Sequence, residues 1–241
     1  MKTLKVLGFF LTYPTLQHKE VLDECKEILV TEKVLNDQAL ASMMRLMEWV
    51  EGHDVLDLQE EYVNLFDRTP SLSLHLFEHV HGDSRERGQA LVNLNEIYTA
   101  AGLMISTEEM PDYLPLFLEY LSILPAAESS QNLADAINVI GAVGERLKNR
   151  DSLYAGVFES LQNIAKRKPD AQAIAVALQK SKGDALKLDE LDKEWTEQFA
   201  FENSAQTTVD AGQCPSAQDM VNRMNRPVTA PHVTTPHKET K

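Results

Sequence analysis

Side chains that could ligate a metal or tie a helix corner together are densest between residues 76 and 88. This segment holds two histidines, three acidic residues and two arginines around a central Gly82: His79, His81, Glu78, Asp83, Glu86, Arg85 and Arg87. Imidazole and carboxylate groups are common ligands of Zn, Mn and Fe. The same groups can also hold a turn between two helices by charge pairs. The segment is therefore either a metal site or a structural corner.

A metal-dependent hydrolase would use His79, His81 and Asp83 together with a carboxylate from elsewhere in the chain. The spacing of the two histidines argues against this interpretation, because residues two apart on a helix diverge by about 200° at roughly 100° per residue. The sequence also has no His-Glu-x-x-His motif. The hydrolase remains the less favoured alternative, and no metal is predicted.

The favoured interpretation of this segment is a structural corner at Gly82. Glu78 is expected to pair with Arg85 or Arg87 across the corner, where charge-assisted hydrogen bonds would satisfy groups that a buried turn leaves unpaired. The two histidines are expected to bond the last carbonyls of the short helix before the corner.

A second polar motif is Pro111-Asp112-Tyr113-Leu114-Pro115. Asp112 fits the N-cap of the next helix, and Pro115 then falls in the first turn, where its missing N–H is harmless. Alternatively, acidic and aromatic side chains here form a ledge that binds an arginine-bearing peptide by ion pairing and cation–π contact. The candidate peptide-binding residues are Asp112, Tyr113, Glu119 and Tyr120.

A cluster of methionines with one tryptophan is a third candidate surface, made of Met43, Met44, Met47 and Trp49. Methionine-rich faces adapt to varied partners. Such residues more often fill a hydrophobic core, and the core interpretation is favoured here.

The sequence does not predict an enzyme. It has no Gly-x-Ser-x-Gly elbow and no glycine-rich phosphate loop, and neither Cys25 nor Cys214 lies near a histidine in a recognisable pattern. Two distant cysteines do not make a disulfide framework, which favours a reducing, cytoplasmic compartment.

The net charge of −14 argues against nucleic acid or an anionic membrane as the main partner. It favours a basic partner, although acidity alone also keeps a protein soluble. The N-terminal apolar run is too short to cross a bilayer, and we expect a first short helix that ends before Pro14.

Apolar residues recur at helical spacing almost throughout, as in the run Leu114, Phe117, Leu118 and Leu121. The fold class predicted is all-α, a single helical bundle over residues 1–202. Asp151 suits the N-cap of the helix that carries Leu153. Residues 203–241 are rich in Pro and Thr and are expected to be disordered, with a short helix possible around 217–224.

Three sequence blocks together resemble the NarJ family of nitrate reductase assembly chaperones, within the wider TorD/DmsD-like group. They are residues 62–68 (Tyr-Val-Asn-Leu-Phe-Asp-Arg), residues 76–90, which contain Leu-Phe-Glu-His-Val-His-Gly, and residues 111–121, which begin Pro-Asp-Tyr-Leu-Pro. The resemblance covers roughly residues 1–200 and implies an all-helical cytoplasmic protein of the TorD-like type, without cofactor or catalysis.

The resemblance also implies a client, the catalytic subunit of a membrane-bound nitrate reductase. Members of this family bind the N-terminal, twin-arginine-like peptide of that subunit and keep it competent for molybdenum cofactor insertion. They then leave the mature complex. A chaperone of the same fold that serves another molybdoenzyme remains an alternative, and the sequence does not give the oligomeric state.

One residue departs from the family's pattern. Relatives commonly have Pro-Asp-His where this chain has Pro111-Asp112-Tyr113. Tyrosine keeps an aromatic, hydrogen-bonding side chain but cannot carry a positive charge. A pH-dependent role of that histidine is therefore not carried over, whereas Asp112 is.

Overall fold

A computed structural model describes residues 1–81, 85–105, 109–165 and 167–175, with only the backbone described for His81 and Arg85. Regular structure in these ranges is helical, and an isolated bridge between His75 and Tyr113 is the one β-type pairing among them. The all-α prediction is confirmed. The predicted tail and the boundary at residue 202 lie outside the described residues.

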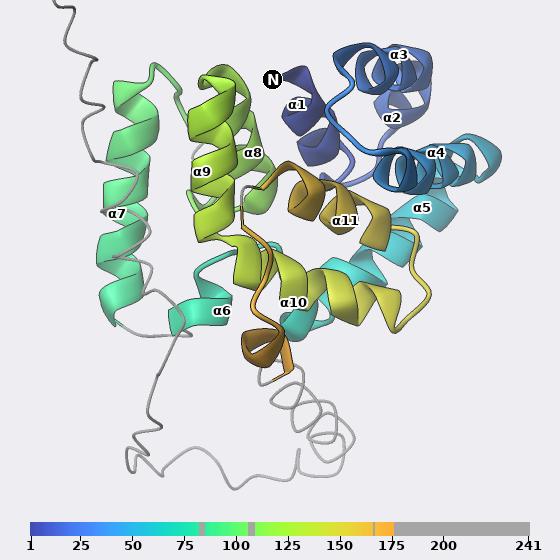
Figure 1. Cartoon of the computed structure of the whole chain (residues 1–241). Helices are drawn as coiled ribbons and strands as arrows, with labels where there is room; N and C mark the ends of the chain where they lie inside the picture. Colours follow the sequence, from blue (N-terminus) through green and yellow to red (C-terminus); the bar gives the residue numbers. More distant parts are fainter. Residues whose placement is uncertain (82–84, 106–108, 166, 176–241) are drawn as a thin grey trace, which may run out of the picture.

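The described helices follow one another with short connections (Figure 1). In chain order they are α1 (Lys2–Phe9), α2 (Leu16–Glu20), α3 (Leu22–Glu32), α4 (Asp37–Gly52), α5 (Val55–Tyr62), the π-helical turn η1 (Val63–Asp67), the 3-10 turn η2 (Pro70–Leu72), α6 (Glu78–His81), α7 (Arg85–Ala100), α8 (Leu114–Ile123), α9 (Ala126–Asp135), α10 (Ile137–Lys148) and α11 (Ala155–Ile164). A further helical turn begins at Ala171.

Helix α1 lies inside the bundle, packed against α3 and α8. Its first backbone N–H groups, which have no partner within the helix, donate to the Glu32 carboxylate at 2.9 Å from Lys2 N and 2.7 Å from Thr3 N. Gly8 allows the approach to α8, since a Cβ there would lie 3.2 Å from the Pro115 carbonyl oxygen. The predicted first helix, ending before Pro14, is confirmed.

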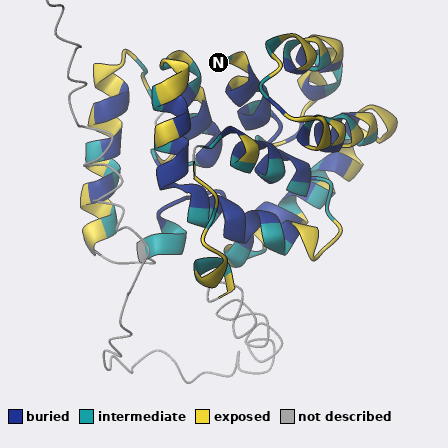
Figure 2. Ribbon diagram, in the orientation of Figure 1, coloured by how far each residue is buried: buried dark blue, intermediate teal, exposed yellow. Residues whose placement is uncertain are grey.

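Helices α4, α10 and α11 form the other half of the core (Figure 2), and most of α10 is buried or half-buried. Met43 and Met47 are fully buried, while Met44 and Trp49 are half-buried and pack against the core. The core interpretation of this methionine cluster is therefore confirmed. It offers no exposed methionine face.

Asp151 does not cap α11, and that prediction was wrong. It adopts a left-handed conformation with φ 53°, three residues beyond the last residue of α10. The N–H of Asp151 bonds the Lys148 carbonyl at 3.0 Å, and the N–H of Ser152 bonds the Leu147 carbonyl at 3.0 Å. This is a Schellman motif, so the residue closes the preceding helix instead of starting the next one.

None of the helices in the described part of the chain combines the length and apolar character needed to span a bilayer.

Replacing Gly156 by alanine is expected to destabilise the protein. A Cβ at this position of α11 would lie 3.0 Å from both the Cβ and the carbonyl oxygen of Ser42 on α4. The resulting overpacking costs about 1–3 kcal/mol and outweighs the roughly 0.5–1 kcal/mol that alanine gains over glycine in a helix. Gly88→Ala on α7 is the matched control, because nothing lies within 4 Å of its Cβ. Urea unfolding should show opposite signs for the two variants, and equal stabilisation would contradict the prediction.

Candidate functional site

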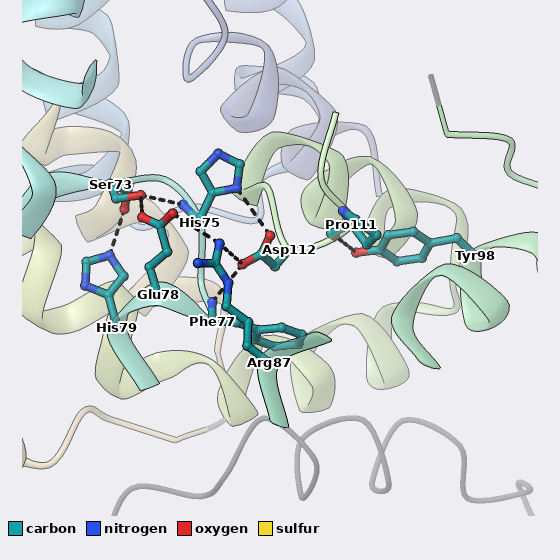
Figure 3. A network of polar contacts seen from close by, with 9 residues as sticks. All are labelled: Ser73, His75, Phe77, Glu78, His79, Arg87, Tyr98, Pro111 and Asp112. Atoms are coloured by element: carbon teal, nitrogen blue, oxygen red, sulfur yellow. Dashed lines mark hydrogen bonds and ion pairs between the residues drawn. The ribbon is translucent and has the colours of Figure 1, made fainter. Parts of the chain in front are cut away.

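A backbone pairing brings together the two polar blocks that were singled out from the sequence. The N–H of Leu76 bonds the Asp112 carbonyl at 3.0 Å, and the N–H of Leu114 bonds the Leu74 carbonyl at 2.8 Å. The loop before α6 therefore lies beside the loop before α8, with the first turn of α7 next to both. We call this arrangement the polar corner, comprising Ser73, His75, Phe77, Glu78, His79, Arg87 and Asp112 (Figure 3).

The Asp112 carboxylate is the centre of the polar corner and is fully buried. It accepts hydrogen bonds from Phe77 N at 3.1 Å and His75 Nδ1 at 3.2 Å, and the Arg87 guanidinium lies 3.8 Å away. The predicted N-cap role was wrong, since α8 begins at Leu114 with no side-chain cap. The side chain instead satisfies donors of the neighbouring loop.

Glu78 is the second carboxylate of the polar corner. It accepts a hydrogen bond from Arg87 at 3.1 Å and another from the Ser73 hydroxyl. The predicted pair between Glu78 and Arg87 is confirmed. The side chain of Arg85, the other expected partner, lies outside the described part of the structure, as do Gly82, Asp83 and the side chain of His81.

The two described histidines of the polar corner have pKa values shifted in opposite directions. The hydrogen bond to the Asp112 carboxylate raises the pKa of His75. Burial lowers the pKa of His79, whose Nε2–H donates to the Ser73 carbonyl at 2.8 Å. His79 therefore bonds a carbonyl before its helix and not, as expected, one at the helix end.

The described residues contain no group of three or more His, Cys, Asp and Glu side chains arranged to hold a metal. His79 is one of the ligands that the hydrolase alternative requires, and its Nε2 is bonded to the Ser73 backbone carbonyl. The geometry in the described ranges thus favours the structural interpretation of this segment.

The four predicted peptide-binding residues do not form one exposed ledge. Asp112 is inside the polar corner, and Tyr120 is buried with its ring centroid 5.0 Å from that of Tyr98. Tyr113 is half-buried, and its hydroxyl lies 3.1 Å from that of Tyr62. Glu119 alone is well exposed, and it pairs with Lys5 at 3.3 Å.

Three residues of this region were not singled out from the sequence. His75 carries the hydrogen bond to Asp112, Tyr98 donates to the Pro111 carbonyl at 3.0 Å, and Tyr62 donates to the Leu11 carbonyl at 2.9 Å. The two tyrosines lie on apolar helical stripes, which predict core positions, and His75 lies in a loop. Their hydrogen bonds join chain segments far apart in sequence, and residue spacing along the chain does not predict such bonds.

Comparison with known proteins places this sequence in a family. The sequence pattern of the family described as "Nitrate reductase delta subunit" matches residues 33–160, which include the whole polar corner. A relative from Escherichia coli (strain K12), the probable nitrate reductase molybdenum cofactor assembly chaperone NarW, is 35% identical over 205 residues, 82% of each chain. This chain belongs to the NarJ family.

Two further relatives are also named as nitrate reductase molybdenum cofactor assembly chaperones. The nitrate reductase molybdenum cofactor assembly chaperone NarJ of Escherichia coli (strain K12) is 37% identical over 175 residues, 73% of this NarJ-family chain and 74% of that protein. A probable NarJ chaperone of Bacillus subtilis (strain 168) is 26% identical over 169 residues, covering 68% and 91%. The family resemblance expected from the three sequence blocks is confirmed.

Removing the buried carboxylate should destabilise the fold strongly. Asp112→Ala leaves the Phe77 N–H, the His75 ring and the Arg87 guanidinium without this acceptor, at a cost of roughly 3–5 kcal/mol. Asp112→Asn keeps one acceptor oxygen and should cost less. Glu119→Ala removes an exposed carboxylate and should cost under about 1 kcal/mol. Urea unfolding monitored by circular dichroism distinguishes them, and an Asp112→Ala variant as stable as Glu119→Ala would refute the central role of this side chain.

The two histidines should give stability changes of opposite pH dependence. Folding raises the pKa of His75, so its charged form stabilises the fold below the unfolded pKa and this contribution disappears as the pH rises through the folded pKa. The loss caused by His75→Asn should therefore be greater at about pH 5.5 than at about pH 8. Folding lowers the pKa of His79, so His79→Gln should show its greater loss at the higher pH. Parallel pH profiles of the two variants would contradict these assignments.

Proposed function

We propose that this chain is an assembly chaperone that binds the apo catalytic subunit of respiratory nitrate reductase at its N-terminal, leader-like peptide. It keeps that subunit competent for molybdenum cofactor insertion and is not part of the final enzyme. The observation that carries the proposal is membership of the NarJ family, with relatives named as nitrate reductase molybdenum cofactor assembly chaperones over most of this chain.

The charge of the chain supports a basic client. The net charge is −14, and residues 203–241 hold four basic and three acidic side chains, so the acidity belongs to the preceding residues. A leader with arginines and an apolar helical face complements such a body, since opposite potentials speed encounter and fix register. The contribution of charge to affinity should weaken as salt is added.

The role of the polar corner in this function is indirect. Asp112 is buried and occupied by groups of its own chain, so its carboxylate is placed to hold the loop before α6 against α8. Glu119 is the one predicted binding residue that presents an exposed carboxylate. We therefore propose that Asp112 supports client binding by maintaining the fold, while exposed carboxylates contact the client.

The described residues also support a chaperone without covalent chemistry. The Cys25 thiol is buried, and burial raises its pKa to about 11. A thiol with so high a pKa is a poor nucleophile near neutral pH.

We propose that the chain acts in the cytoplasm, where its client awaits the cofactor.

The proposal predicts a specific and transient complex in nitrate-respiring cells. The tagged chaperone should co-purify with the cofactor-free catalytic subunit and not with the assembled reductase. Deleting the chaperone should leave the subunit present but low in molybdenum, and the wild-type gene should restore the metal content. Metal analysis and mass spectrometry measure both outcomes.

A second molybdoenzyme produced in the same cells is the control for client choice. If its catalytic subunit co-purifies and the nitrate reductase subunit does not, the chaperone serves another client of the same class. Normal molybdenum content of nitrate reductase in the deletion strain would overturn the proposal.

A further inference from the structure

An exposed apolar surface lies on α2, α5 and the connection before α2. Leu16 and Leu56 are exposed to 67% and 73%, and Tyr13 is exposed to 47%. Tyr13 packs edge-on against Tyr62 of α5, with ring centroids 5.7 Å apart. Large apolar side chains so exposed are costly to hydrate, and a group of them marks an interaction surface when they lie together.

Two hydrogen bonds place the segments that carry these side chains next to each other. Gln59 Nε2 donates to the Pro14 carbonyl at 2.8 Å, and Lys19 Nζ donates to the His53 carbonyl at 2.7 Å. Leu16 lies three residues before Lys19 and Leu56 three residues before Gln59, so each leucine is on the same face of its helix as a side chain that bonds the other segment. We infer from this spacing that the two leucines belong to one surface. We call it the α2–α5 face; it lies on the side of the molecule occupied by α2, α4 and α5 in Figure 1.

Carboxylates border the α2–α5 face. Residues 13–20 and 54–61 together contain five acidic side chains and one lysine: Glu20, Asp54, Asp57, Glu60, Glu61 and Lys19. Four of the acids are exposed. The lysine ammonium donates to a backbone carbonyl of this surface, and the nearby His18 is buried, which lowers its pKa and favours its neutral form. The apolar surface thus lies in a strongly negative field.

We propose that the α2–α5 face is the docking site for the arginine-bearing, amphipathic leader of the client. The inference rests on the function proposed above and gives it a location different from the polar corner. The two leucines and Tyr13 would receive the apolar face of a short helix, and Asp57 and Glu60 would pair with its basic residues.

The charge of the face favours a basic leader over two other occupants, a second copy of the chain and the chain's own residues 203–241. A second copy of the chain would bring two acidic borders together, which like-charge repulsion opposes. Residues 203–241 hold nearly balanced charges, so they complement the face less well than a basic leader does. A basic amphipathic peptide matches both the apolar and the acidic parts.

The apolar contribution is tested with paired serine variants. The probe is a synthetic peptide of the first twenty or so residues of the nitrate reductase catalytic subunit, titrated calorimetrically against the full chain. Leu16→Ser with Leu56→Ser should weaken binding about tenfold or more, because the apolar contacts are lost. Val30→Ser with Val92→Ser is the matched control, since these valines are exposed to 51% and 52% on α3 and α7. The control should bind within about twofold of the wild type.

The charge contribution is tested in the same titration. Asp57→Asn with Glu60→Gln should weaken binding and reduce its dependence on salt. Glu24→Gln with Glu27→Gln removes two exposed carboxylates of α3 and should leave the salt dependence in place. All substituted side chains are exposed, so circular dichroism should show unchanged folding.

The outcomes separate this inference from the proposed function. Wild-type binding that is unaffected by the α2–α5 variants overturns the docking site and leaves the chaperone function standing. A change of sedimentation in those variants without a change in leader affinity assigns the face to a second copy, which also overturns the inference. Failure of the wild-type chain to bind the leader overturns the docking site together with the leader-binding part of the proposed function.

Discussion

A buried carboxylate that accepts hydrogen bonds from the loop before α6 and faces a guanidinium of α7 is the constraint on which the polar corner depends. Asp112 faces the loop before α6 through Phe77, the imidazole of His75 and the guanidinium of Arg87 at the start of α7. A buried charge is tolerated only when hydrogen bonds and opposite charges replace water. The geometry of that corner consequently depends on one side chain, and Asp112, which was predicted to bind a peptide, is fully buried.

In this NarJ-family chain, the residues of the sequence motifs and the residues of the exposed surface have different roles. The residues that identify the family are largely engaged with one another, in the polar corner and in the bonds of Tyr62 and Tyr113 to the Leu11 carbonyl. The surface that we propose for a basic amphipathic peptide lies on α2 and α5, and it meets this network at Tyr62, whose ring packs against Tyr13. The bonded motif residues maintain the fold, and the proposed docking surface consists of exposed side chains outside the motifs.

Much of the fold was predictable from sequence because helical periodicity is a local property. The stripe of Leu114, Phe117, Leu118 and Leu121 became the buried face of α8, and the core placement of Met43 and Met47 followed from burial preference. Asp112 and Asp151 were misjudged for a shared reason. An aspartate beside a helix resembles an N-cap in sequence, but a distant partner or a left-handed turn can take it instead. Long-range bonds such as that between His75 and Asp112 leave no periodic signature.

The bridge between His75 and Tyr113 has a topological effect. It joins the two ends of an excursion of the chain that carries α6 and α7, so the rest of the bundle is already closed at the base of that excursion. Segments closed in this way open as separate cooperative units when their own contacts fail. Opening of this excursion would expose the buried side chains of α7 and the Asp112 carboxylate, while the helices outside it keep their own packing.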